Sequence, residues 1–208
     1  MALTDDGRQF DMEPTVLRIP LFPLHTVLFP GGALPLRIFE PRYLDMVSDS
    51  LRNSSPFGIC MITEGEETGD PATVCQFGTL GEISYWQKLA NGMLGITVRG
   101  KQRFRVLASD VLKNKLTMAD VELIEDESPA ELPEKYQSLS AMLKEMIENI
   151  GHPYTTLPKD YNNVVWLGYR LAELLPLSRL QKQHFLEMTD PYERMERISL
   201  IMAELELR

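Results

Sequence analysis

The spacing of apolar residues changes once along this chain of 208 residues, and that change constrains the fold more than any other feature. Up to about residue 125, apolar and polar residues alternate as in strands; after residue 133, apolar residues recur every three or four positions as in helices. A charged segment with two prolines separates the two parts. We therefore predict an α+β protein with a flexible N-terminal arm over 1–15, a β-rich lobe over 16–125, an acidic, proline-containing linker over 126–133 and an α-helical bundle over 134–208.

Short β-prone runs in the first part predict a mostly antiparallel, strongly bent sheet or open barrel. The runs cover 16–21, 33–38, 57–63, 74–86, 94–98, 104–108 and 115–124. Pro41 is well placed at the first position of a helix that ends by Asn53. Its inward face is predicted to carry Leu44, Val47 and Leu51, so that one helix packs against the sheet.

Glycines are expected to shape this sheet at three points. Gly78 and Gly81 interrupt one run and predict a bulged or bent strand. Asn91-Gly92 predicts a hairpin with a type I′ turn, because both central residues of that turn need a positive φ. Gly100 is predicted to turn the chain between the strands over 94–98 and 104–108.

The second part predicts several packed helices. Ser178 with Gln181, and Asp190 with Glu193, match capping boxes that start two of them. An earlier helix is expected to end at Gly151. Its apolar stripe comprises Tyr136, Leu139, Leu143, Met146 and Ile150.

Charge and cysteine content exclude several classes of protein. Thirty acidic against 21 basic residues give a net charge of −9, which opposes general binding to nucleic acids or anionic membranes. Two cysteines cannot build a disulfide framework or a four-cysteine zinc site. Since no apolar run reaches the roughly 20 residues of a membrane span and the N-terminus resembles no signal peptide, we expect a soluble cytoplasmic protein.

No catalytic, metal or cofactor site is predicted. The stretch Gly95–Lys101 imitates a phosphate-binding loop, but Gln102 stands where a Mg²⁺-binding hydroxyl is required, and the stretch falls on a predicted strand. The histidines at 25, 152 and 184 are too far apart in sequence to show a metal-ligand spacing. We therefore expect no enzyme.

Four basic residues alternate along one predicted strand: Arg99, Lys101, Arg103 and Arg105. On an extended chain they share a face, which would give a positive patch for acidic peptide or phosphate. The alternative, which we favour, is a solvated strand face whose charges are paired with neighbouring carboxylates.

Six stretches of the sequence are distinctive: Ile19–Leu24 (IPLFPL), Val27–Tyr43 (VLFPGGALPLRIFEPRY), Phe77–Ile83 (FGTLGEI), Val98–Val106 (VRGKQRFRV), Lys182–Glu187 (KQHFLE) and Asp190–Met195 (DPYERM). Together they closely resemble the N-terminal, or substrate-binding, domain of Lon proteases, over about residues 16–206. The resemblance implies a PUA-like β lobe joined to a helical bundle. It also implies a non-catalytic module that binds unfolded or tagged polypeptides, as an adaptor or accessory to proteolysis and protein quality control, with a protease or chaperone as partner. The ATPase and peptidase modules of that family are not present in this sequence.

Two other functions stay open at this point. A small-molecule-binding protein or enzyme could use the cleft between the lobes, since such clefts often hold ligands. An RNA binder is the weaker alternative, because the basic stripe is its only candidate footprint and the net charge opposes it.

Residues in the resembling motifs have structural or binding interpretations. Pro23, Pro30 and Gly31 are expected to set turns. Ion pairs of Arg37, Glu40 and Arg42 are expected to connect the β lobe to its helix. Five aromatic residues would bind an extended hydrophobic peptide if they are exposed, and would form core if they are buried: Phe22, Phe29, Phe39, Tyr43 and Trp86.

Overall fold

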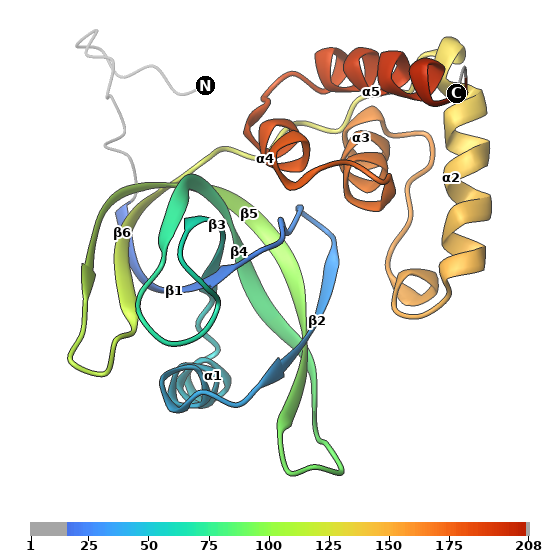
Figure 1. Ribbon diagram of the computed structural model, residues 1–208. Coiled ribbons are helices and arrows are strands. Elements are labelled where there is room, and N and C mark those ends of the chain that lie inside the picture. The colour runs from blue at the N-terminus through green and yellow to red at the C-terminus, as the bar shows by residue number, and fades with distance from the viewer. Residues whose placement is uncertain (1–15, 207–208) are drawn as a thin grey trace, which may run out of the picture.

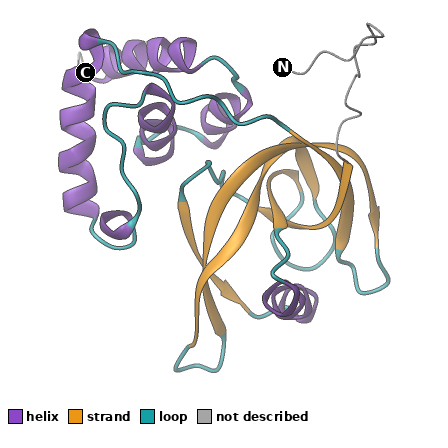
Figure 2. Cartoon of the chain, turned by 180° about the vertical axis from the view of Figure 1, so that it is seen from behind, coloured by secondary structure: helices purple, strands orange, loops and turns teal. Residues whose placement is uncertain are grey.

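A computed structural model describes residues 16–206, so the arm predicted over 1–15 lies outside the described residues (Figure 1). The fold is mixed α+β, and its strands and α-helices follow in the order β1 (Val16–Leu24), β2 (Ala33–Ile38), α1 (Pro41–Asn53), β3 (Phe57–Glu64), β4 (Thr73–Lys88), β5 (Leu94–Val111), β6 (Thr117–Leu123), α2 (Gln137–Ile150), α3 (Val164–Leu174), α4 (Arg179–Glu187) and α5 (Pro191–Glu206). Short 3₁₀ helices cover Glu134–Tyr136 and Tyr154–Thr156. We call β1–β6 with α1 the β lobe, and α2–α5 the helical lobe; Figure 2 shows the two side by side.

The six strands form one strongly curved sheet in the order β2-β5-β4-β3-β1-β6. The long strand β5 also pairs with β6, so five strands close into a ring and β2 is added at the edge. All pairings are antiparallel except that of β1 with β3. The prediction of a bent, mostly antiparallel sheet is therefore confirmed, and the barrel is closed where we had expected an open one.

Gly100 does not turn the chain, and that prediction is wrong. The strands expected over 94–98 and 104–108 are one continuous strand, β5. A Cβ on Gly100 would lie 2.1 Å from the carbonyl oxygen of Phe29, and the Gly31 amide donates to the Gly100 carbonyl at 2.8 Å. Glycine is needed here because a loop backbone packs directly on the strand.

The other glycine predictions have mixed outcomes. The register of β4 against β5 shifts between Thr79 and Gly81, which confirms the bulge. The β4–β5 hairpin exists, but of its two turn residues only Gly92 has a positive φ, +82°. The Leu89 amide bonds to the Met93 carbonyl at 2.8 Å, which closes a three-residue loop. Such loops combine a type I turn with one left-handed glycine, so the predicted type I′ turn is wrong.

Helix α1 has the predicted ends, but of its predicted inward face only Val47 is buried. Leu44 and Leu51 are 36% and 40% exposed, whereas Tyr43, Met46 and Val47 are buried. The ring of Tyr43 stacks on Phe22 with centroids 4.3 Å apart, so an aromatic contact with β1 sets the rotation of the helix. The buried residues Tyr43, Met46 and Val47 have helical spacing as good as that of the predicted stripe, so apolar periodicity alone could not identify the buried face.

The helical lobe keeps most of its predicted start and stop signals. Ser178 and Gln181 form the complete capping box of α4. Asp190 Oδ1 accepts the amides of Tyr192 and Glu193 at the start of α5, but the Glu193 side chain pairs with Arg197, so this second box is half formed. The predicted α2 stripe is correct at Leu143 and wrong at Ile150, which is 46% exposed.

Candidate functional site

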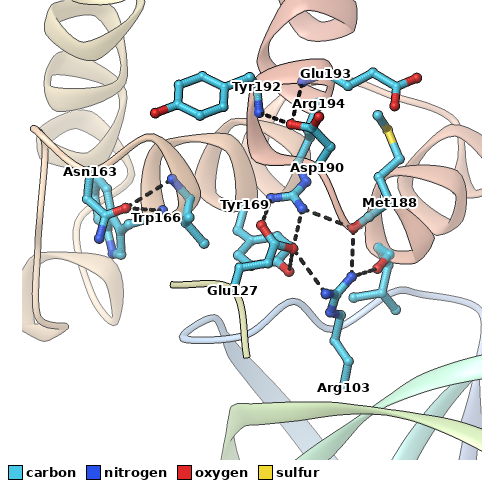
Figure 3. A network of polar contacts seen from close by, with 12 residues as sticks. Arg103, Glu127, Asn163, Trp166, Tyr169, Met188, Asp190, Tyr192, Glu193 and Arg194 are labelled. Carbon is cyan, nitrogen blue, oxygen red and sulfur yellow. Dashed lines mark hydrogen bonds and ion pairs between the residues drawn. The ribbon is translucent and has the colours of Figure 1, made fainter. Parts of the chain in front are cut away.

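A buried charged network joins the two lobes around Glu127, as Figure 3 shows. The carboxylate accepts from Arg194 Nη1 at 3.0 Å and forms an ion pair with Arg103 Nη2 at 3.0 Å. Tyr169 also donates its hydroxyl to this carboxylate. Arg103 reaches from β5 to donate to the carbonyls of Leu186 at 2.8 Å and Met188 at 2.7 Å. Since the arginines come from β5 and α5, the network fixes the helical lobe against the barrel.

A second network does the same around Glu173 of α3. Arg170 Nη1 lies 2.6 Å from this carboxylate, and Tyr154 Oη donates to it at 2.9 Å. Arg170 also donates to the Pro30 carbonyl of the β lobe at 2.7 Å. Burial raises the pKa of Glu173, and the Arg170 charge opposes that rise. Because two buried networks hold the lobes, the surfaces between them are formed before any ligand arrives.

The basic stripe does not form a solvent-facing positive patch. Arg103 is 3% exposed and belongs to the Glu127 network. Lys101 pairs with Glu82 at 2.8 Å and Arg105 with Glu122 at 2.6 Å, as the alternative of carboxylate-paired charges predicted. Arg99 has no ion pair within residues 16–206. The footprint on which the RNA-binding alternative depended is therefore reduced to one arginine.

The five candidate aromatic residues do not gather into one exposed patch. Phe22, Phe29 and Tyr43 are buried, so the structure places them in the core. Phe39 and Trp86 are 56% and 58% exposed. Of the predicted peptide-binding set, these two alone present a ring to solvent.

The remaining motif residues have mainly structural positions. Pro23 lies inside β1, opposite Cys60 of β3, so it does not set a turn there. Gly31 turns the chain with φ +74°, next to Pro30. Arg42 pairs with Glu40 at 3.1 Å and donates to the Lys115 carbonyl at 2.8 Å, which connects α1 to the β5–β6 turn.

Arg37 differs from its two neighbours in the motif. Its side chain is exposed on β2, and it has no ion pair within the described part of the chain.

An apolar groove runs between α4 and α5 on the helical lobe; we call it the α4–α5 groove. It has a volume of about 440 Å³. Leu180 and Leu200 on its two sides are 74% and 61% exposed, far above the other leucines of this lobe between residues 137 and 204. At its rim, Arg197 Nη1 lies 2.7 Å from His184 Nε2. Its lining is Leu180, Gln181, His184, Phe185, Arg197, Leu200 and Ile201.

Two further clefts lie between the lobes, and Arg99 lines both. The interlobe cleft, about 780 Å³, includes Lys101, Gln102, Asn163 and Trp166 among its walls. The hairpin cleft, about 560 Å³, lies between the β4–β5 hairpin and the segment that follows α2. Both have the size of sites that hold small ligands or short peptide segments.

Sequence reasoning missed Leu180 and Leu200, which carry the apolar groove. A signal was present: both are leucines that fall outside the buried stripes of their helices, α4 around Phe185 and α5 around Met195 and Ile198. An extra apolar residue on the polar face of an amphipathic helix points to a contact surface.

Residues 16–206 contain neither a metal-binding cluster nor a helix that could span a membrane. No group of three histidine, cysteine or acidic residues there is arranged to hold a metal ion. No described helix combines the length and apolar character that crossing a bilayer requires.

Comparisons with known proteins agree on one family. A family model described as the ATP-dependent protease La (LON) substrate-binding domain matches residues 18–204. Lon protease 2 of Herpetosiphon aurantiacus is 27% identical over 97% of this chain, and Lon protease of Dictyoglomus thermophilum is 28% identical over 91%. The chain spans only 26% and 25% of those relatives' lengths.

Solved structures give the same result for the fold. A Lon N-terminal domain protein from Xanthomonas campestris matches with TM-score 0.74 and 36% identity, over 88% of this chain and 98% of that one. The N-terminal domain of the Mycobacterium avium complex Lon protease shares the fold at TM-score 0.60 and 18% identity, over 88% of this chain and 96% of that one. Since the family model covers nearly the whole chain, this protein belongs to the LON substrate-binding domain family.

Proposed function

We propose that this protein is a non-catalytic polypeptide-binding module that holds apolar segments of unfolded or tagged chains in the α4–α5 groove. Family membership supports binding of a polypeptide substrate. The single observation that selects the groove is the exposure of Leu180 and Leu200 across a hollow lined by Phe185 and Ile201. A contiguous apolar surface of this kind suits a partner that brings apolar side chains.

The groove predicts weak, reversible binding. Each apolar side chain that it buries contributes about 1.5–3 kcal/mol. Two or three such side chains must also offset the cost of association and of ordering an unfolded chain. We therefore expect dissociation constants of about micromolar to millimolar, which suits a module that samples many clients.

The wider role follows from the same proposal. An adaptor or accessory to proteolysis in the cytoplasm needs a surface that distinguishes unfolded from folded chains, and exposed leucines do this because folded clients bury their own apolar side chains. We also propose that the β lobe is PUA-like and that the helical lobe is a helical bundle. A protease or chaperone would then be the partner that receives the client.

Calorimetric titration with an unfolded apolar peptide tests the groove. The double variant Leu180→Ser/Leu200→Ser should weaken binding at least tenfold. Its melting temperature should change little, since exposed side chains contribute little to stability. Leu107→Ser on β5 is the matched control, because Leu107 is 48% exposed but lies outside the groove. Equal affinities of wild type and double variant would reject the groove as the binding site.

A further inference from the structure

The hairpin cleft has a floor of three strands and a roof from the helical lobe. Its floor carries Ala33 of β2, Thr97 and Arg99 of β5, and Ser84, Tyr85 and Gln87 of β4. Ala33 lies opposite Arg99, and Tyr85 opposite Thr97, so these residues are neighbours across the sheet. Its other wall comprises His152, Pro153, Thr156 and Leu157.

No carboxylate of residues 16–206 lines this cleft, although the chain has 30 acidic residues and a net charge of −9. Two acids near it in the fold are already bound, and Asp126 and Glu127 line the interlobe cleft rather than this one. Glu82 lies opposite Arg99 in the sheet but pairs with Lys101 at 2.8 Å. Glu173 contacts Arg170 and Tyr154. Arg99 therefore faces the cleft with no anionic partner within the described residues.

The rest of the lining suits an oxygen-rich ligand. The Gln87 amide and the His152 ring can donate hydrogen bonds to it, whereas the Thr156 hydroxyl already donates to the Pro153 carbonyl at 2.8 Å and the Tyr85 hydroxyl donates to Gln87 Oε1 at 3.4 Å. Tyr85 is 56% exposed and its hydrogen bond to Gln87 is long, so its hydroxyl can turn to a ligand. An arginine surrounded by neutral donors matches the planar, bidentate geometry of a carboxylate. A phosphate dianion would favour a second cation, and Arg99 is the one arginine or lysine of this lining.

We propose that the hairpin cleft binds a carboxylate and that Arg99 is its charged partner. The site is separate from the α4–α5 groove, since the two share no lining residue. The same carboxylate chemistry can come from an acidic polypeptide segment or from a small organic acid. Lined by both lobes and held by the two buried networks, the cleft is formed in advance for either ligand.

The test uses three probes and calorimetric titration at low salt. The probes are an acetylated, amidated peptide rich in Asp and Glu, the same peptide with Asn and Gln in their place, and succinate. Wild type should bind the acidic peptide, succinate or both, and should not bind the neutral peptide. Binding of succinate alone would identify a small-acid site, and binding of the acidic peptide alone would identify a site for polypeptide carboxylates.

Matched variants connect binding to Arg99, which lines the hairpin cleft and the interlobe cleft. Arg99→Gln should weaken carboxylate binding at least tenfold, and Arg99→Lys should restore part of it because the charge returns without the bidentate fork. Arg37→Gln is the control, since Arg37 is an exposed arginine of neighbouring β2 outside the cleft. Leu180→Ser/Leu200→Ser should leave carboxylate binding unchanged, which keeps this test independent of the proposed groove. The proposal is overturned if no carboxylate probe binds to wild type, or if Arg99→Gln binds the acidic probes as well as wild type does.

Discussion

Replacing Glu127 by glutamine should destabilise the protein far more than loss of any surface ion pair. The substitution keeps the shape of the side chain and removes its charge. Arg103 and Arg194 are 3% and 0% exposed, so both guanidinium groups would stay buried without their shared anion. Breaking a buried pair in this way costs about 3–5 kcal/mol. That is a large share of a typical folding stability of about 5–15 kcal/mol.

Thermal unfolding followed by circular dichroism measures the effect. For a domain of this size, each kcal/mol shifts the melting temperature by about 2–4 °C, so Glu127→Gln should lower it by about 6–20 °C. Glu122→Gln is the control, because it removes the carboxylate that pairs with exposed Arg105 and should cost about 0–1 kcal/mol. Equal melting temperatures for the two variants would show that the Glu127 network does not hold the lobes together.

Three further predictions follow from single positions. Gly100→Ala should lower the free energy of unfolding, measured by urea titration, by at least about 2 kcal/mol, because the new Cβ would lie 2.1 Å from the Phe29 carbonyl oxygen and this backbone cannot move aside. A urea midpoint equal to that of wild type would contradict the close packing. Tyr43→Ala removes a buried ring and should lower the free energy of unfolding by about 3–5 kcal/mol, whereas Phe39→Ala removes an exposed ring and should leave the melting temperature close to that of wild type. If Phe39→Ala were the more destabilising variant, the burial of the two rings would be misassigned. Burial raises the pKa of Tyr43 to about 12, so its phenol stays neutral in the folded state at pH values where the unfolded chain ionises, near 10. The free energy of unfolding should therefore fall as the pH rises from about 10 to 12, and Tyr43→Phe should make this decrease smaller. If the variant loses as much stability over this pH range as wild type does, other groups cause the decrease.

The spacing of apolar residues predicted which parts of the chain form strands and which form helices, because the backbone geometry of each element sets that spacing locally. The strands end at Leu123 and α2 begins at Gln137, on either side of the predicted linker. Whether the two parts fold as independent domains stays a prediction. The prediction for Gly100 was wrong because a turn and a close approach of distant backbone both require glycine, and the local sequence does not distinguish them.

The candidate site could be predicted less well, because burial of a charged or aromatic residue depends on partners far away in sequence. Arg103 and Arg105 alternate identically along β5, yet the first is buried against Glu127 and the second pairs with Glu122 at the surface. Phe22 and Phe39 both lie in the resembling stretches, yet the first is buried and stacks on Tyr43 while the second is exposed. The local pattern contains nothing that separates the members of either pair.

The binding surface itself is tested most directly by methyl NMR of wild-type protein titrated with an unfolded apolar peptide. The account predicts saturable shift changes that are largest at the methyl groups of Leu180, Leu200 and Ile201 in the α4–α5 groove. Changes centred instead on the β lobe around Phe39 or Trp86, with these three groups unaffected, would contradict it.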